Sequence, residues 1–200
     1  RWQLVMMSFI ILMHNTALAI LPFDAPTLPP PVILSASDDI QKFLLKYVKL
    51  PAEPFSDSST EKTFLYRLQR EIPSLLATEG YFSPRVTVSH HVLDDIVQHE
   101  IEVDAGPLTR VGEVSITFQG DIAQDNETYR KRIEHIRESW SLKHDAPFRS
   151  SDWEQAKSAL LATVTEEEFA SAQIVSSQAS VDPEHVRANL VLLIDSGPVF

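Results

Sequence analysis

The 200-residue sequence predicts an α+β protein made of two similar modules, each with the order strand, helix, helix, strand, strand (βααββ). Two repeats indicate the modules: Leu-Leu-Ala-Thr occurs at 75–78 and again at 160–163, and Gly-Pro occurs at 106–107 and again at 197–198. Between these marks, alternating apolar and polar residues predict half-buried strands. We expect each module to form a three-stranded mixed sheet with two helices on one face, leaving the other face and one edge open.

The first module is placed at residues 32–106, where a short apolar run at 32–34 predicts a strand. Asp38-Asp39 is expected to cap the helix that follows. Apolar residues at helical spacing mark the buried stripe of this helix: Ile40, Phe43, Leu44, Tyr47 and Val48. The serine-rich stretch 56–59 is expected to cap a second helix.

The second helix of this module is expected to end at Gly80, a glycine suited to a left-handed C-cap. Pro73 lies inside its apolar pattern, so we expect a kink or a fresh turn there. The alternating segments 81–92 and 96–104 then predict a hairpin around Asp94-Asp95.

The second module is placed at residues 107–197. The segment 111–118 predicts a strand with its valines and isoleucine on one face, and a helix is expected at 129–136. A capping box at 151–154 predicts the start of a long helix. Its buried stripe comprises Trp153, Ala156, Leu160, Leu161 and Val164. No glycine follows this helix, so we expect a longer polar loop there, followed by strands at 172–179 and 186–194 joined by 181–184.

The N-terminal residues have the pattern of a signal for export. Arg1 precedes an apolar run that ends in Ala17-Leu18-Ala19, which predicts a signal peptide over residues 1–19. The run is shorter than the roughly twenty apolar residues that span a bilayer. Residues 20–31 contain five prolines and predict a stiff linker.

Composition excludes several classes of function. The net charge of −11 disfavours nucleic acid as a partner, because the phosphate backbone is itself negative. With no cysteine, the chain has no thiol chemistry, disulfides or cysteine zinc sites. Its five glycines form no nucleotide-binding motif, and neither G-x-S-x-G nor H-E-x-x-H occurs. We therefore expect no enzymatic activity and no cofactor.

Several motifs together resemble a known family. They are Leu-Leu-Ala-Thr-Glu-Gly-Tyr-Phe-Ser-Pro (75–84), Ala-Gly-Pro-Leu-Thr-Arg-Val-Gly-Glu-Val (105–114), Trp153-Glu154-x-x-Lys157, Val181-Asp182-Pro183 and Asp195-Ser-Gly-Pro-Val-Phe200. With the repeat length and the βααββ order, they resemble tandem POTRA (polypeptide-transport-associated) domains over residues 33–200, and more narrowly the N-terminal part of the TamA group of outer-membrane assembly factors. The chain departs from this pattern at 165–169, where the second module lacks the glycine of the first.

The resemblance implies a role in inserting or secreting outer-membrane proteins such as autotransporters. It implies a location in the periplasm on an outer-membrane protein, a TamB-like partner anchored in the inner membrane, and outer-membrane protein clients. It also implies that residues 198–200 begin a third module, which leads to a C-terminal transmembrane β-barrel. None of these properties follows from composition or spacing alone.

The residues themselves point to one binding site. In a βααββ sheet the second strand commonly lies at an edge, where another extended chain can add a strand. The expected binding strand is Arg85, Val86, Thr87, Val88, Ser89 and His90. The pairs Gly106-Pro107 and Gly197-Pro198 are interpreted as hinges between modules, because proline after glycine restricts the entry to the next strand.

An alternative function rests on histidines. A hairpin that turns at residues 94–95 places His90 opposite His99, with His91 adjacent in sequence. Two imidazoles close together suit a transition metal, although zinc sites need three or four ligands. The alternative is therefore a soluble periplasmic metal-binding protein or enzyme that uses His90, His91 and His99.

Overall fold

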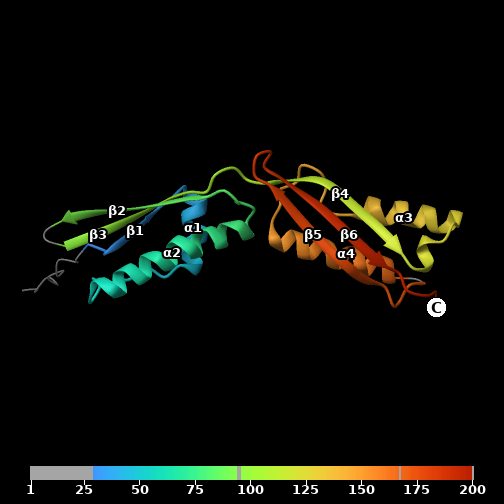
Figure 1. Ribbon diagram of the computed structural model, residues 1–200, viewed down its shortest axis with the longest axis horizontal. Coiled ribbons are helices and arrows are strands. Elements are labelled where there is room, and N and C mark those ends of the chain that lie inside the picture. Colours follow the sequence, from blue (N-terminus) through green and yellow to red (C-terminus); the bar gives the residue numbers. More distant parts are fainter. Residues whose placement is uncertain (1–28, 94–95, 167, 200) are drawn as a thin grey trace, which may run out of the picture.

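The computed structural model describes residues 29–93, 96–166 and 168–199. The predicted signal peptide, most of the linker and the hairpin residues Asp94-Asp95 lie outside the described residues. The described chain forms two three-stranded mixed sheets, each with helices on one face, arranged end to end (Figure 1). This confirms the predicted α+β fold with two βααββ units.

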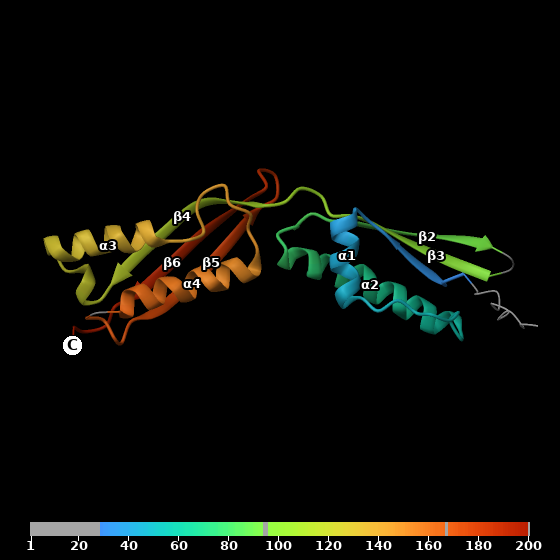
Figure 2. The ribbon, with the colours of Figure 1, turned by 180° about the vertical axis from the view of Figure 1, so that it is seen from behind.

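The first unit contains the elements β1 (Val32–Ser35), α1 (Asp38–Tyr47), α2 (Ser58–Thr78), β2 (Arg85–Leu93) and β3 (Ile96–Asp104). The strand order is β1-β3-β2, with β3 parallel to β1 and antiparallel to β2. The helices cover the same side of the sheet, as the view from behind also shows (Figure 2). Strand β2 therefore lies at an edge of its sheet.

The core of the first unit lies between this sheet and its helices. Its fully buried members include Leu44, Leu68, Ile72, Leu76 and Ile101. The prediction for Tyr47 is wrong: this last residue of α1 is 58% exposed, and the buried residue is Val48, which follows the helix in extended conformation. The N-cap of α1 is Ser37, so Asp38 and Asp39 occupy the first turn, where carboxylates interact favourably with the helix dipole.

Both ends of α2 are closed by local hydrogen bonds. At its start the Asp57 side chain accepts from the main-chain N–H groups of Ser59 and Thr60. At its end Gly80 N–H donates to Ala77 O and Tyr81 N–H donates to Leu76 O, with Gly80 at φ 94°, which is the Schellman arrangement. The C-cap prediction is confirmed, whereas Pro73 starts no fresh turn, because α2 runs unbroken through it.

The second unit contains β4 (Arg110–Gln119), a short 3₁₀ helix η1 (Asp121–Ala123), α3 (Glu127–Ser139), α4 (Ser150–Thr165), β5 (Gln173–Asp182) and β6 (Arg187–Asp195). The order β4-β6-β5 repeats that of the first sheet. Its core is larger and includes Ile122, Trp140, Phe148, Trp153, Phe169, Leu190 and Leu192. None of the helices in the described ranges is long and apolar enough to cross a bilayer.

Several local predictions for the second unit need correction. Helix α4 begins at Ser150 with Arg149 as N-cap and no side-chain cap, so the predicted capping box does not form. Leu161 is only partly buried. Strand β5 runs to Asp182, beyond the predicted 179, and β6 begins at Arg187, so the turn moves to residues 183–186, with Val186 at φ 55°.

A bulge in β4 changes which residues share a face. Val111 pairs with Ala188 and Val114 pairs with Leu190, so three steps along β4 match two along β6. The bulge places Val111 and Val114 on the same face, which strict alternation does not allow. The Asn189 side chain accepts the Glu113 N–H at 2.9 Å and so satisfies a main-chain donor of the bulge.

Candidate functional site: sheet edges and the joint between the units

Strand β2 presents one side of its main chain to no partner strand. His99 N–H donates to Pro31 O, so His99 and Ile101 direct their main-chain groups toward β1. The intervening Glu100 therefore faces β2 and forms a hydrogen-bonding pair with Ser89. The main-chain N–H and C=O groups of Ser89 therefore point toward β3, whereas those of Val88 and His90 point outward, away from the sheet.

The two faces of β2 differ in chemistry. Val86 and Val88 pack against the core of the first unit. Arg85, Thr87 and Ser89 lie on the exposed open face of the sheet. Beside them the central strand carries an acidic row, in which Asp104, Glu102 and Glu100 pair with Arg85, Thr87 and Ser89. The predicted binding strand itself, Arg85–His90, contains no carboxylate.

The free edge of β4 is covered at Val111, Gly112 and Ile116, in contrast to that of β2. Arg137 donates through Nε and Nη2 to Ile116 O at 3.2 and 3.0 Å, and His144 Nδ1 lies 3.0 Å from Gly112 O. Val111 exchanges two main-chain hydrogen bonds with Asp145 and Ala146. Within the described ranges no side chain or loop makes such a hydrogen bond to the main chain of β2.

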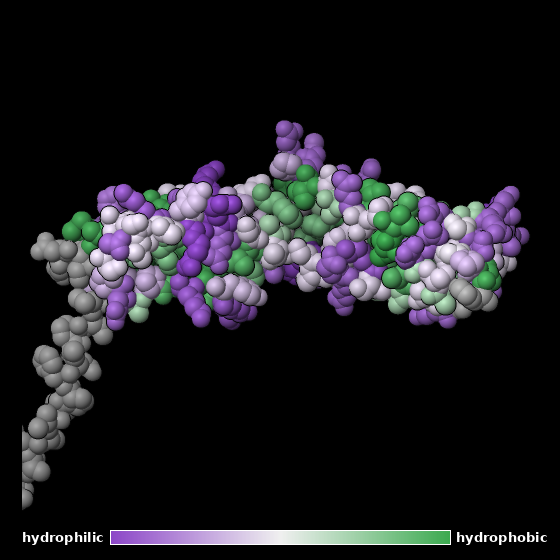
Figure 3. All heavy atoms as spheres, turned by 60° about the horizontal axis from the view of Figure 1, so that its bottom comes forward, coloured by the Kyte–Doolittle hydropathy of each residue, from purple (hydrophilic) through white to green (hydrophobic). Residues whose placement is uncertain are grey.

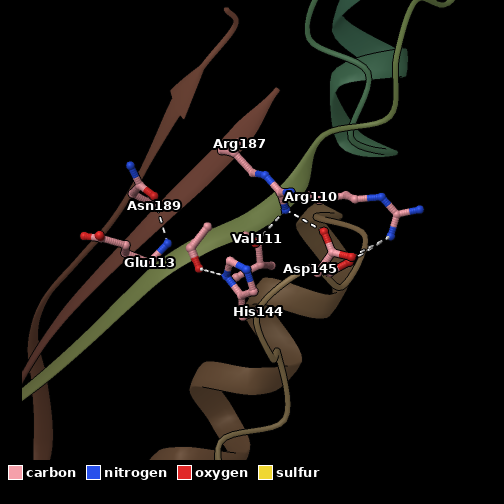
Figure 4. A network of polar contacts seen from close by, with 8 residues as sticks. Arg110, Val111, Glu113, His144, Asp145, Arg187 and Asn189 are labelled. Carbon is pink, nitrogen blue, oxygen red and sulfur yellow. Dashed lines mark hydrogen bonds and ion pairs between the residues drawn. The ribbon is translucent and has the colours of Figure 1, made fainter. Parts of the chain in front are cut away.

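The loop that covers β4 is held by a polar network. Arg187 donates to Asp145 Oδ1 at 2.6 Å, and Arg110 donates to Asp145 O at 2.8 Å (Figure 4). The hydrogen bond from Arg187 is the main cause that lowers the pKa of Asp145 below its ordinary value. This network joins the loop before α4 to β4 and β6.

The three histidines do not converge on one point. His90 and His99 pair across β2 and β3 as expected, with ring centroids 6.4 Å apart. His99 is buried on the helix side, where its Nε2 lies 3.0 Å from Glu61 Oε1 of α2. His91 lies on the open face, 3.6 Å from Glu100. Because His91 lies on the opposite face of the sheet from His99, this geometry does not favour the metal-binding alternative. Among the described residues no cluster of three or more metal-ligating side chains occurs.

The two units touch where α2 ends. Thr109 N–H donates to Gly80 O at 2.9 Å, and the Phe82 and Phe148 rings stack with centroids 6.0 Å apart. Arg149 Nε lies 3.3 Å from Glu79 Oε2. A methyl group on Gly80 would collide with Phe148 O, so a glycine is needed for this close approach. Hydrophobic residues appear on the surface midway along the molecule, where the units meet (Figure 3).

Both predicted hinges have the same local structure. Gly106 N–H donates to Asp104 Oδ1 at 3.0 Å, and Gly197 N–H donates to Asp195 Oδ1 at 2.9 Å. Both glycines have positive φ, 71° and 64°. The bond from Gly197 is the main cause of the lowered pKa of Asp195. The hinge role of Gly106-Pro107 and Gly197-Pro198 stays a prediction.

Sequence reasoning missed the residues of the joint and of the covered β4 edge. Phe148 and Arg149 follow Pro147 in a loop without periodicity, and the residues that they contact lie in the other unit. The hydrogen bond from Arg137 of α3 also depends on the tertiary fold, because its acceptor, Ile116 O, lies on β4. The local signal was Tyr81-Phe82 directly after Gly80, in the segment 81–92 predicted as a strand; that prediction is wrong at its start, because β2 begins only at Arg85.

Comparisons with known proteins return solved structures alone. No family model matches, and no curated protein matches. BamA from Haemophilus ducreyi lacking POTRA domains 1–3 is 20% identical over 83% of this chain and 28% of its own, with a TM-score of 0.40. Haemophilus influenzae BamA POTRA3-5 is 15% identical over 84% and 65%, with a TM-score of 0.40. POTRA1-2 of Omp85 from Anabaena is 14% identical over 86% and 96%, with a TM-score of 0.44. The chain thus spans less than two thirds of the first two structures.

Proposed function

We propose that this chain is a pair of POTRA-like modules in the periplasmic part of an outer-membrane assembly or translocation factor. It acts without enzymatic chemistry, by binding client or partner chains as an added strand. The sequence resemblance supports this reading, as does the βααββ order of both units. Within the family, the motifs favour the TamA group, with autotransporters among the clients and a TamB-like partner. The segment then lies in the periplasm, attached to the outer membrane.

One observation carries the proposal: the outward edge of β2 receives no hydrogen bond from the described residues, whereas the edge of β4 is covered at Val111, Gly112 and Ile116. The main-chain groups of Val88 and His90 point away from β3 and receive no hydrogen bond from the described residues. Main-chain hydrogen bonds tolerate many side chains, which an assembly factor with varied clients requires. The turns at Gly106-Pro107 and Gly197-Pro198 then set the direction in which each module presents its edge.

The test removes one outward-pointing main-chain N–H from β2 and leaves the other main-chain groups of the strand in place. His90→Pro deletes the N–H that points outward, while His90→Ala keeps it and serves as the matched control. The readout is binding of an unfolded outer-membrane protein segment, measured by fluorescence anisotropy with circular dichroism as the check on folding. We expect His90→Pro to weaken binding by about tenfold and His90→Ala to bind as the unmodified chain does. Equal binding by both folded variants would reject β2 as the binding edge.

A further inference from the structure

A second surface, on the other unit, has the chemistry of a binding site for carboxylates. A groove of about 540 Å³ runs between β4 and the C-terminal end of α3. Its walls include Val114 and Ile116 on the strand side and Arg137, Lys143 and His144 on the helix side. Three basic side chains thus line one groove in a chain whose net charge is −11.

The hydrogen bonds of these three side chains are to the main chain, although the Asp145 carboxylate interacts electrostatically with His144. Arg137 bonds Ile116 O, Lys143 Nζ donates to Glu138 O at 2.6 Å, and His144 bonds Gly112 O. All three acceptors are main-chain carbonyls. Among the described residues no carboxylate lies within ion-pair distance of any of the three. Glu113 also lines the groove, but its carboxylate is directed away from His144 (Figure 4).

The donors that remain are suited to an anion. Arg137 uses Nε and one hydrogen of Nη2, so hydrogens on Nη1 and Nη2 remain for a ligand. Lys143 uses one of the three hydrogens on Nζ for its bond to Glu138 O. Because Gly112 O can only accept, neutral His144 carries its proton on Nδ1 and presents Nε2 as an acceptor.

The strand side of the groove offers main-chain contacts over a short stretch. Gln119 faces β6, since Ser196 N–H donates to its carbonyl, so Ile116 and Val114 face outward by alternation. Ile116 O is occupied by Arg137 and Gly112 O by His144. Among the described residues no hydrogen bond to the outward main-chain groups of Val114 occurs, so both are available to an extended ligand. Trp140, 4% exposed and fixed by its bond to Leu142 O, is a rigid apolar part of the wall.

We infer that this groove binds an extended peptide through a carboxylate. The peptide main chain aligns with β4 at Val114, and its carboxylate reaches Arg137 and Lys143. The carboxylate belongs either to an acidic side chain or to the C-terminus of the peptide. This site goes beyond the proposed function, because it lies on the second unit and uses charge, whereas the β2 edge uses main-chain bonds alone.

The test compares labelled peptides that differ only in their carboxylate. One alternates threonine and valine around a central glutamate and ends in an amide. A second replaces glutamate with glutamine and ends in a free carboxylate, and a third has neither group. We expect the full chain to bind at least one carboxylate peptide about tenfold more tightly than the third in low salt, with the preference declining as salt rises. The first two peptides identify the source of the carboxylate.

Substitutions then test whether the preference for carboxylate peptides depends on this groove. Lys143→Gln and Arg137→Gln are expected to remove it, whereas Arg130→Gln, at an exposed position of the same helix α3, keeps it. Lys143→Gln guards against misfolding, because the only hydrogen bond of the Lys143 side chain among the described residues is to a carbonyl in the last turn of α3. Equal binding of the three peptides overturns the inference, as does a preference that both groove variants retain. The His90 variants leave this preference unchanged, so failure of the two proposals is distinguishable.

Discussion

Hydrogen bonds, more than burial, shift the pKa values of single carboxylates in this protein. Asp57 is the clearest case. The Thr60 N–H and hydroxyl, the Ser56 hydroxyl and the Ser59 N–H all donate to its carboxylate, and they lower its pKa from 3.8 to about 2. The sequence marked this stretch as a helix start through its polar residues. It did not select Asp57 over its serine neighbours, because several of them have capping oxygens.

The lowered pKa of Asp57 predicts how stability depends on pH. A group with a depressed folded pKa stabilises the fold above its unfolded value of 3.8, and this contribution is lost as pH falls toward about 2. Asp57→Ser keeps a capping oxygen that does not titrate. We expect the melting temperature of the unmodified chain to exceed that of the variant near pH 6, and the difference to shrink between pH 4 and pH 2, in thermal melts followed by circular dichroism. Parallel curves for the two proteins would contradict the assignment.

At the level of secondary-structure elements, the two units differ in how their long helices, α2 and α4, end. Helix α2 ends at Gly80 with a Schellman turn, but α4 has no glycine and ends in a loop. That loop is anchored by Phe169, which is fully buried and lies edge-on to Tyr129 with centroids 5.7 Å apart. The longer loop was predictable from the missing glycine. The anchor was not, since the polar residues around Phe169 give no periodicity.

Replacing the anchor is expected to destabilise the second unit strongly. Phe169→Ala leaves a cavity in the core and should cost about 3–5 kcal/mol of the free energy of unfolding. Phe169→Leu keeps most of the volume and should cost less, about 1–1.5 kcal/mol. Urea denaturation monitored by tryptophan fluorescence measures both, because Trp140 and Trp153 belong to the same core. A loss below 1 kcal/mol for Phe169→Ala would show that the loop is not anchored there.

At the scale of the whole molecule, the joint determines how the units are presented. The Arg149–Glu79 ion pair is partly exposed, with side chains 45% and 36% accessible, so its contribution is about 0–1 kcal/mol. The stacked pair Phe82 and Phe148 adds burial to ring contact, and such aromatic pairs contribute about 0.5–1.5 kcal/mol beyond burial. The aromatic contact is therefore expected to dominate the coupling between units.

This ranking is testable with spin labels. The chain has no cysteine, so Lys62→Cys and Ser158→Cys place one label on each unit without competition. We expect Phe82→Ala to broaden the distribution of label distances measured by electron paramagnetic resonance, and Arg149→Gln to change it little. Circular dichroism melts check that both units remain folded. A distribution that widens only with Arg149→Gln would reverse the ranking.

Local sequence patterns are sufficient to predict the two βααββ units, the helix end at Gly80 and the alternating faces of the hairpin. These features depend on residues a few positions apart, so periodicity and turn chemistry are sufficient to predict them. Only the tertiary structure decided that Val88 and His90 point outward, that Arg137 covers Ile116 and that Phe148 stacks on Phe82. Those features depend on strand pairing and on contacts between residues distant in sequence, which no local pattern encodes.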